Sequence, residues 1–161
     1  MTEAEERAAV VLEAMSWIGT AYHHEGRVKC SRDALGRVTD KGGVDCAQIL
    51  VGVYHAALPD RVPDLVVPRY AMDQHMHKPL AGEMPELYLD WVMRFGHETD
   101  TPRPGDIVLY RWGHAYAHGA IVMAPGWPSI VHANASSRAV VRDTGTFGRL
   151  LEKPKKFFTL W

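Results

Sequence analysis

The sequence has little excess charge of either sign, only two cysteines and no long apolar run. Lys and Arg number 18 and Asp and Glu number 19, so the formal net charge is -1. A balance of this kind lacks the basic footprint of a nucleic-acid-binding domain. No stretch reaches the ~20 consecutive apolar residues that a membrane helix needs. Neither a nucleic-acid partner nor membrane insertion is therefore expected.

The N-terminus and the cysteines bear on whether the protein has a signal peptide and a disulfide. The first residues, MTEAEERAAVV, are acidic where a signal peptide would be basic, so we predict no signal peptide and synthesis in the cytoplasm. Cys30 and Cys46 could pair, but a single bridge is a weak reason for two cysteines in a domain of this size. We interpret both as free thiols, with Cys30 incidental.

What is present is typical of one globular domain. The chain has 161 residues, of which 47% are apolar and 23% charged. Apolar residues recur at helical spacing over 3–18, 46–58 and 86–95, and residues 20–44 show no clean period and predict a long loop. Later in the chain come short β-rich runs between Gly and Pro turns: DIVLYRW, HGAIVMA, SIVHANA, AVVRD and KKFFTLW. Helices first and strands afterwards predict an α+β fold with an antiparallel sheet of about five strands.

Cys46 stands where a loop meets a helix, in the stretch GGVDCAQIL. Asp45 is a good N-cap residue, which places Cys46 in the first helical turn. The partial positive charge and free N–H groups of a helix N-terminus favour the nucleophilic thiolate and can hold a developing oxyanion. The alternative is that Cys46 is a small buried hydrophobe, as free cysteines often are. These nine residues alone do not decide between the two.

Two histidines of the predicted sheet supply the base that such a thiol needs. If residues 125–127 form the tip of a hairpin, His118 lies across from Asn134 and diagonally beside His132 on one face. An imidazole–imidazole hydrogen bond is then within reach. We predict Cys46 as nucleophile, His118 as general base and later acid, and His132 as the group that fixes the tautomer of His118. Asn134 is an alternative orienting residue, and a register shift of one residue would break the arrangement.

Five ordered motifs resemble the NlpC family of papain-like cysteine peptidases. They are GTAY (19–22), GGVDCAQILVGVY (42–54), RPGDIVLYRW (103–112), HGAIVM (118–123) and IVHA (130–133). Each motif is weak by itself, whereas the ordered set is specific. The match leaves out residues 59–101, called the 59–101 segment below, which we expect to be an insertion into a single NlpC-type catalytic domain spanning 1–161.

The resemblance implies a papain-like fold with the nucleophile at a helix N-terminus packed on the sheet, and the same Cys-His-His triad. It also implies Tyr22 near the thiol as a substrate or oxyanion contact. The implied reaction is hydrolysis of peptidoglycan stem peptides, typically between D-glutamate and a diamino acid such as meso-diaminopimelate, and no cofactor is expected. Ala47 and Gln48 stand where the family usually has serine and glycine, which bears on the specificity subsite and not on the nucleophile.

Other residues are expected at the cleft on weaker grounds. Trp112 ends a strand shortly before His118 and is expected at the cleft mouth, and Asp45 is expected beside the substrate or oxyanion. Arg27 and Arg111 could pair with substrate carboxylates, although charge balance alone would explain both.

Nine histidines also invite a metal interpretation. None has a Cys or carboxylate partner at zinc-site spacing, so solvated side chains are the expectation and no metal is predicted. The residues concerned are His23, His24, His75, His77 and His114.

Three functions remain open on the sequence. The first is a cell-wall peptidase; its missing signal, size and 103–112 motif are similar to phage-tail members, with tail proteins as partners, although a cytosolic recycling enzyme would also lack a signal. The second is a tail structural component that kept the fold and lost activity. The third is acyl transfer or lipid hydrolysis by the same triad. An apolar, open cleft would support the third, and a polar cleft with a cation near Tyr22 would support the first.

Overall fold

The computed structural model describes residues 1–77 and 86–161, apart from the side chain of Leu87. The helices are α1 (Glu3–Ser16), α2 (Cys46–Ala57) and α3 (Leu87–Met93), with 3₁₀ turns η1 (Gln74–Met76) and η2 (Gly148–Leu150). The strands are β1 (Arg27–Val28), β2 (Ser31–Arg32), β3 (Val38–Asp40), β4 (Gly43–Val44), β5 (His97–Glu98), β6 (Ile107–Trp112), β7 (Ala115–Val122), β8 (Ser129–Asn134), β9 (Ala139–Thr144) and β10 (Lys155–Thr159). Helices therefore precede a β-rich half, which confirms the α+β class. In the described part, no helix combines the length and the apolar character that crossing a bilayer would demand.

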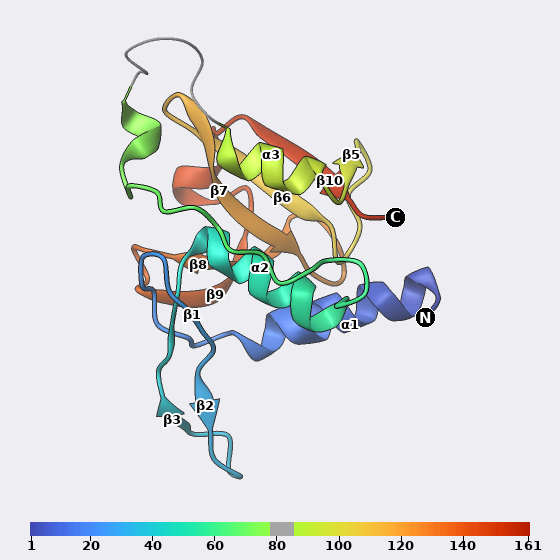
Figure 1. Cartoon of the computed structure of the whole chain (residues 1–161), viewed down its shortest axis with the longest axis vertical. Helices are drawn as coiled ribbons and strands as arrows, with labels where there is room; N and C mark the ends of the chain where they lie inside the picture. Colours follow the sequence, from blue (N-terminus) through green and yellow to red (C-terminus); the bar gives the residue numbers. More distant parts are fainter. Residues whose placement is uncertain (78–85) are drawn as a thin grey trace.

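The main sheet has six antiparallel strands in the order β5-β10-β6-β7-β8-β9 (Figure 1). Five of them are the strands that the sequence predicted, including β10 as the closing strand beside β6. The sixth, β5, has two residues and pairs with β10. A strand of that length carries no alternating pattern, which is why the sequence did not show it.

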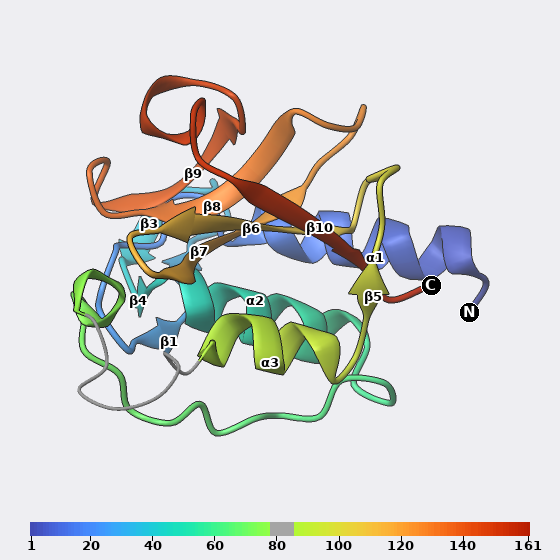
Figure 2. The same ribbon diagram turned by 90° about the horizontal axis from the view of Figure 1, so that it is seen from above.

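Three helices cover one face of this sheet, as Figure 2 shows. Helix α2 packs between α1 and the strands β7 and β8, and α3 lies against β7. Burying a large apolar side chain from α2 contributes about 1.5–3 kcal/mol, so the position of this helix is set by its apolar face. The core joins α2 to the sheet through Ile49, Leu50, Val53, Tyr54, Leu109, Ile121 and Val131.

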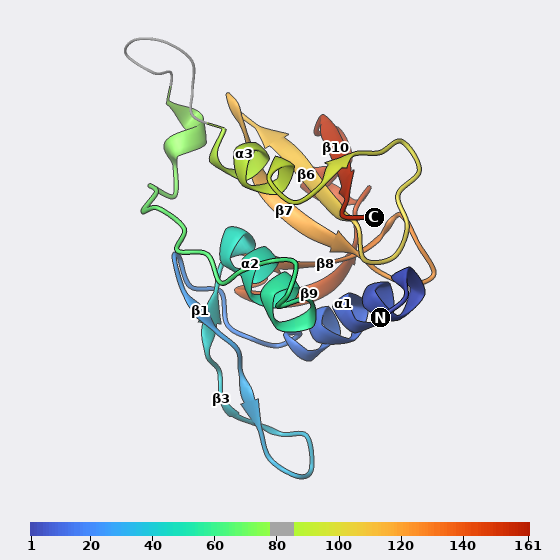
Figure 3. The same cartoon turned by 45° about the vertical axis from the view of Figure 1, so that its right-hand side comes forward.

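Strands β7 and β8 pair through Ile121↔Val131 and Val122↔Ile130. This is the register that a hairpin tip at 125–127 predicted. Among the described residues, β7 and β8 pair only at these two positions, close to the hairpin. Figure 3 shows the two strands diverging from there. His118 and His132 lie on the diverging part.

Residues 20–44 hold short strands where the sequence predicted a long loop. β1 pairs with β4, and β2 pairs with β3 in a hairpin that projects from the body of the molecule (Figure 1). The side chains of β2 and β3 are exposed, so no apolar alternation marks these strands. The chain passes close to itself at Gly42, where a Cβ would meet the Val28 carbonyl oxygen at 2.1 Å.

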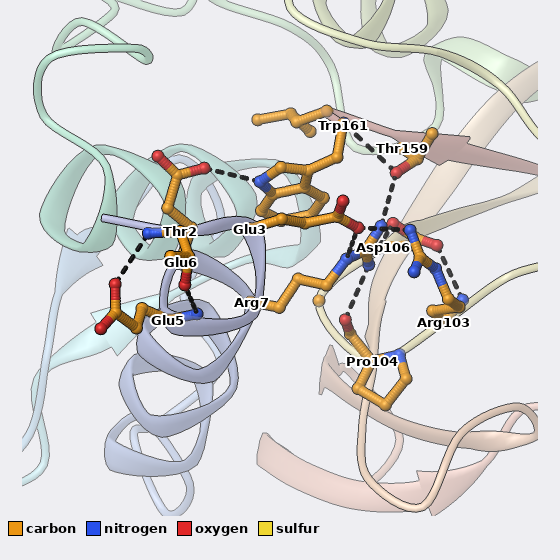
Figure 4. Close-up of polar contacts among 12 residues, drawn as sticks. Thr2, Glu3, Glu5, Glu6, Arg7, Arg103, Pro104, Asp106, Thr159 and Trp161 are labelled. Atoms are coloured by element: carbon orange, nitrogen blue, oxygen red, sulfur yellow. Dashed lines mark hydrogen bonds and ion pairs between the residues drawn. The ribbon is translucent and has the colours of Figure 1, made fainter.

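Arg7 fastens α1 to the sheet and to the C-terminus (Figure 4). Its Nη1 donates to the Pro104 carbonyl and to Asp106 Oδ1, each at 2.9 Å, and its Nη2 donates to Thr159 Oγ1 at 3.0 Å. The guanidinium also lies 4.1 Å from the ring centroid of Trp161. Arg7 is 8% exposed and Asp106 is 1% exposed, so each buried charge compensates the other.

The described parts of the 59–101 segment run beside the helical layer and join the sheet at β5 (Figure 2). Its first described part holds the turn η1, and its last part holds α3 and β5. The helix predicted at 86–95 is present as α3. Residues 78–85 of this segment lie outside the described residues.

Candidate active site

A cavity of about 540 Å³ opens at the N-terminus of α2. Its walls come from α2, from the strands β7, β8 and β9, and from the 59–101 segment. The structure thus brings together side chains that lie far apart in the sequence. All seven predicted site residues line this cavity: Tyr22, Asp45, Cys46, Trp112, His118, His132 and Asn134.

The two histidines form the predicted pair. His118 Nε2 lies 2.7 Å from His132 Nδ1, and the rings meet edge to face with centroids 5.0 Å apart. Burial, and secondarily the neighbouring His132, lowers the pKa of His118 to about 3. Burial also lowers the pKa of His132. Both rings are therefore neutral near pH 7, so one nitrogen of the pair donates and the other accepts.

Cys46 is partly buried in the first turn of α2. Its Sγ lies 2.8 Å from the Tyr88 hydroxyl and 3.8 Å from the Ala117 carbonyl oxygen. A carbonyl can only accept, so the thiol donates to Ala117 and the Tyr88 hydroxyl donates to the sulfur. Among the hydrogen bonds of the described residues, none joins this sulfur to His118.

The expectation of a resting thiolate is wrong for this unliganded form. Burial, and secondarily the adjacent Asp45 carboxylate, raises the pKa of Cys46 to about 11. Hydrogen bonds from the Tyr88 hydroxyl and from the backbone N–H groups of Gly119 and Cys46 oppose that rise. Desolvation of the charged form thus outweighs the helix N-terminus, and the thiol is protonated near pH 7.

Asp45 was expected beside the substrate or oxyanion, and the structure assigns its carboxylate to another task. It is 1% exposed, and its Oδ1 accepts from the N–H groups of Ala47 and Gln48 at 3.1 and 3.0 Å. Its Oδ2 accepts from the Glu25 N–H at 2.7 Å and from the Tyr70 hydroxyl. With these acceptor sites occupied, Asp45 caps α2 and ties two loops to it, and it acts on the thiol only through its charge.

Tyr22 and Trp112 are the next two predicted site residues. Tyr22 is half-buried, and burial followed by the charges at Cys46 and Asp45 raises the pKa of its hydroxyl. Trp112 lines the cavity and lies edge-on to His118, with ring centroids 6.1 Å apart.

The Asn134 side chain serves a turn. Its Oδ1 accepts from the N–H groups of Ser136 and Ser137 at 2.9 and 3.3 Å. Of the two residues expected beside His118, it is His132 that bonds to the His118 ring.

Two residues of the site were missed on the sequence. Tyr88 reaches the sulfur from α3, and nothing local in the sequence connects it to Cys46. Asp143 Oδ2 lies 3.5 Å from His132 Nε2, a buried nitrogen that has no hydrogen-bond partner among the described residues. A signal for Asp143 was present: His132 pairs with Val141 across β8 and β9, so position 143 projects on the same face as position 132.

The cations expected at the cleft are not there. Arg27 Nη2 lies 2.9 Å from Asp64 Oδ1, and its Nη1 donates to the Leu65 carbonyl. Neither Arg27 nor Arg111 belongs to the cavity lining among the described residues, whereas Arg149 of η2 does.

The histidines outside the pair have their own positions. His24 Nε2 bonds the Tyr70 carbonyl, His77 pairs with Asp73, and His75 lines the cavity. Over residues 1–77 and 86–161, no group of three or more His, Cys, Asp or Glu side chains is arranged to hold a metal ion.

The cavity is lined by both polar and apolar side chains. Asn134, Ser136, Asp143 and Arg149 are among the polar ones. Apolar side chains from α2 and the 59–101 segment, called the apolar side of the cavity below, are Val51, Val67, Ala71, Met72 and Trp91.

No protein-family model and no curated protein sequence matches the chain. Among solved structures, it is similar to the NlpC/p60 domain of the peptidoglycan hydrolase SagA, with 19% identity, a TM-score of 0.52, and coverage of 93% of this chain and 96% of that one. It is similar to the peptidoglycan hydrolase RipB of Mycobacterium tuberculosis, with 17% identity, a TM-score of 0.56, and coverage of 99% and 68%. An N-acetylmuramoyl-L-alanine amidase of Bacteroides uniformis shows 12% identity, a TM-score of 0.54, and coverage of 95% and 97%. These likenesses show that the chain has the NlpC/P60 fold, as its motifs predicted.

Proposed function

We propose that this chain, with its NlpC/P60 fold, is a thiol hydrolase that cleaves amide bonds in the stem peptides of bacterial cell wall. The observation that carries the proposal is the imidazole pair, joined at 2.7 Å, in one cavity with a thiol at a helix N-terminus. Nucleophile, base and orienting group are the three parts that covalent catalysis by cysteine requires.

The reaction follows from the atoms that are free. The Nε2 of His118 is engaged with His132, so Nδ1 is the nitrogen that remains for the thiol. When a substrate enters, the Cys46 S–H turns from the Ala117 carbonyl to His118, which takes the proton while His132 stabilises the imidazolium. The sulfur then attacks the amide carbonyl, and His118 returns the proton to the leaving amine. His118 then takes a proton from a water molecule, which attacks the thioester carbonyl. The C–S bond breaks, the carboxylic acid leaves, and the proton returns to the Cys46 sulfur.

The finer parts of the proposal have their support in the sequence motifs. The resemblance to NlpC peptidases supports cleavage between D-glutamate and a diamino acid, and it supports a single domain into which the 59–101 segment is inserted. The 103–112 motif supports a lysin that is made in the cytoplasm and delivered with a phage tail. Two neighbours described as peptidoglycan hydrolases support the cell wall as the substrate source.

The test is digestion of purified muropeptides followed by mass spectrometry of the products. We expect Cys46→Ala and His118→Ala each to abolish cleavage with the fold intact, whereas Cys30→Ala retains it because Cys30 is buried away from the cavity. Product masses identify the bond that is cut. Cleavage by Cys46→Ala at the rate of the parent would disprove the thiol mechanism, and an inert parent would favour a scaffold without activity.

A second candidate is favoured by the apolar side of the cavity. Val51, Val67, Met72 and Trp91 offer the kind of surface that an acyl chain would bury. The same thiol and imidazole would then carry out acyl transfer or lipid hydrolysis. A series of p-nitrophenyl esters of increasing chain length distinguishes the two: a rate that rises with chain length, alongside inert muropeptides, supports the acyl reaction.

A further inference from the structure

Tyr88 lies outside the five NlpC-like motifs, and its hydroxyl contacts the sulfur of Cys46. Its Oη lies 2.8 Å from Cys46 Sγ. The ring lies against β7 beside His118, because a Cβ at Gly119 would come within 3.4 Å of Tyr88 Cε1. Helix α3, which carries it, packs on the same strand. The hydroxyl is therefore fixed between the sulfur and the strand that supplies the base.

The direction of this hydrogen bond decides what it does. The S–H is directed to the Ala117 carbonyl, which leaves the sulfur as acceptor and Tyr88 as donor. A hydrogen bond to an anion is about twice as strong as one between neutral groups. The bond therefore strengthens when Cys46 loses its proton, and it favours the ionised form over the neutral one.

We propose that Tyr88 is a catalytic residue that donates a hydrogen bond first to the Cys46 thiolate and then to the oxyanion formed on the attacked carbonyl. This inference rests on the proposed thiol hydrolysis. When the C–S bond forms, the π electrons of the C=O bond move to oxygen, and the charge moves from sulfur to an atom bonded to the same carbon. Tyr88 keeps its proton throughout, so the step needs no further reactant. The backbone N–H groups of Cys46 and Gly119 also favour the Cys46 thiolate.

The test begins with a measurement that needs no substrate. Alkylation of Cys46 by iodoacetamide is followed by peptide mass spectrometry from pH 6 to pH 12, with the Cys30 peptide as internal reference. In Tyr88→Phe, which keeps the ring, we expect the midpoint of the rate profile to move up by about one pH unit. Tyr54→Phe is the control, since it removes a buried hydroxyl that bonds the Gly105 carbonyl far from the thiol, and it should leave the midpoint unchanged.

The second measurement separates a catalytic role from a structural one. On muropeptides, or on the ester that the parent hydrolyses, we expect Tyr88→Phe to lower kcat about a hundredfold with little change in KM, as for loss of an oxyanion donor. An unchanged midpoint, or faster alkylation below pH 8, would show that the hydroxyl is idle or shields the thiol, and either would overturn the inference. If the parent hydrolyses no substrate, the proposed function fails while the alkylation profile still tests Tyr88.

Discussion

At the scale of single residues, the carboxylate of Asp143 lies next to the histidine pair. His132 is 2% exposed, and its Nε2 has only Asp143 Oδ2, 3.5 Å away, to interact with among the described groups. The Asp143 charge raises the pKa of His132 against the larger lowering effect of burial. In the proposed mechanism, a carboxylate so placed would stabilise the positive charge that the imidazole pair gains when His118 takes the thiol proton.

Replacing Asp143 by Asn therefore removes the one influence that raises the pKa of His132. We expect that pKa to fall further in Asp143→Asn, and kcat to fall about tenfold or more because the imidazolium loses a counter-charge. NMR titration of the His132 ring and steady-state kinetics measure the two effects. Asp100→Asn, at an exposed position, should change neither. An unaltered His132 titration in Asp143→Asn would contradict this role.

The same scale shows what the sequence could and could not predict. The alternation of strand residues was enough to place His118 beside His132. The protonation state of Cys46 was not predictable, since a helix N-terminus can be recognised from Asp45 and the apolar run that follows it, whereas desolvation depends on which side chains enclose the sulfur. Those side chains come from distant parts of the chain.

At the scale of elements, long periodic segments were predicted and short ones were not. Helix α2 and the strands β6 to β10 follow from apolar spacing, with ends that differ by at most three residues. Helix α3 was also predicted, but not its contact with β7, because periodicity gives the apolar face of a helix and not the partner of that face. Tyr88 was missed for this reason.

The attachment of α1 depends on one buried ion pair. In Arg7→Met, Asp106 would be left buried without its partner, and we expect the free energy of unfolding to fall by about 3–5 kcal/mol. Urea unfolding followed by circular dichroism measures the change. Arg37→Ala removes an exposed pair with Asp33 and should cost less than about 0.5 kcal/mol. An equally small effect of Arg7→Met would show that the network in Figure 4 adds little stability.

At the scale of the whole molecule, the order of motifs predicted the architecture although identity to the structural neighbours reported above is only 12–19%. What the motifs could not predict is the apolar side of the cavity. It is built in part by the 59–101 segment, which has no counterpart in the motif pattern and carries little periodicity before α3.

The buried histidines predict how stability depends on pH. The pKa values of His118 and His132 are lowered by folding, so below about pH 6.5 the unfolded chain binds protons that the folded chain does not. Stability should therefore fall as the pH falls from 6.5 to 5. The slope contributed by His118 approaches about 1.4 kcal/mol per pH unit, and His132 adds to it in the same direction.

Urea unfolding at a series of pH values measures this slope. His118→Gln should show a shallower slope than the parent, whatever its stability at pH 7, because one of the two neutral rings is gone. Parallel curves for the parent and the variant would mean that His118 does not contribute to acid destabilisation.

Because β7 and β8 diverge, the imidazole pair also links the two strands. Backbone hydrogen bonds pair these strands near the hairpin, and farther from it the hydrogen bond between His118 and His132 joins them. Separating the strands at this end would therefore also break the contact that holds the His118 ring in place.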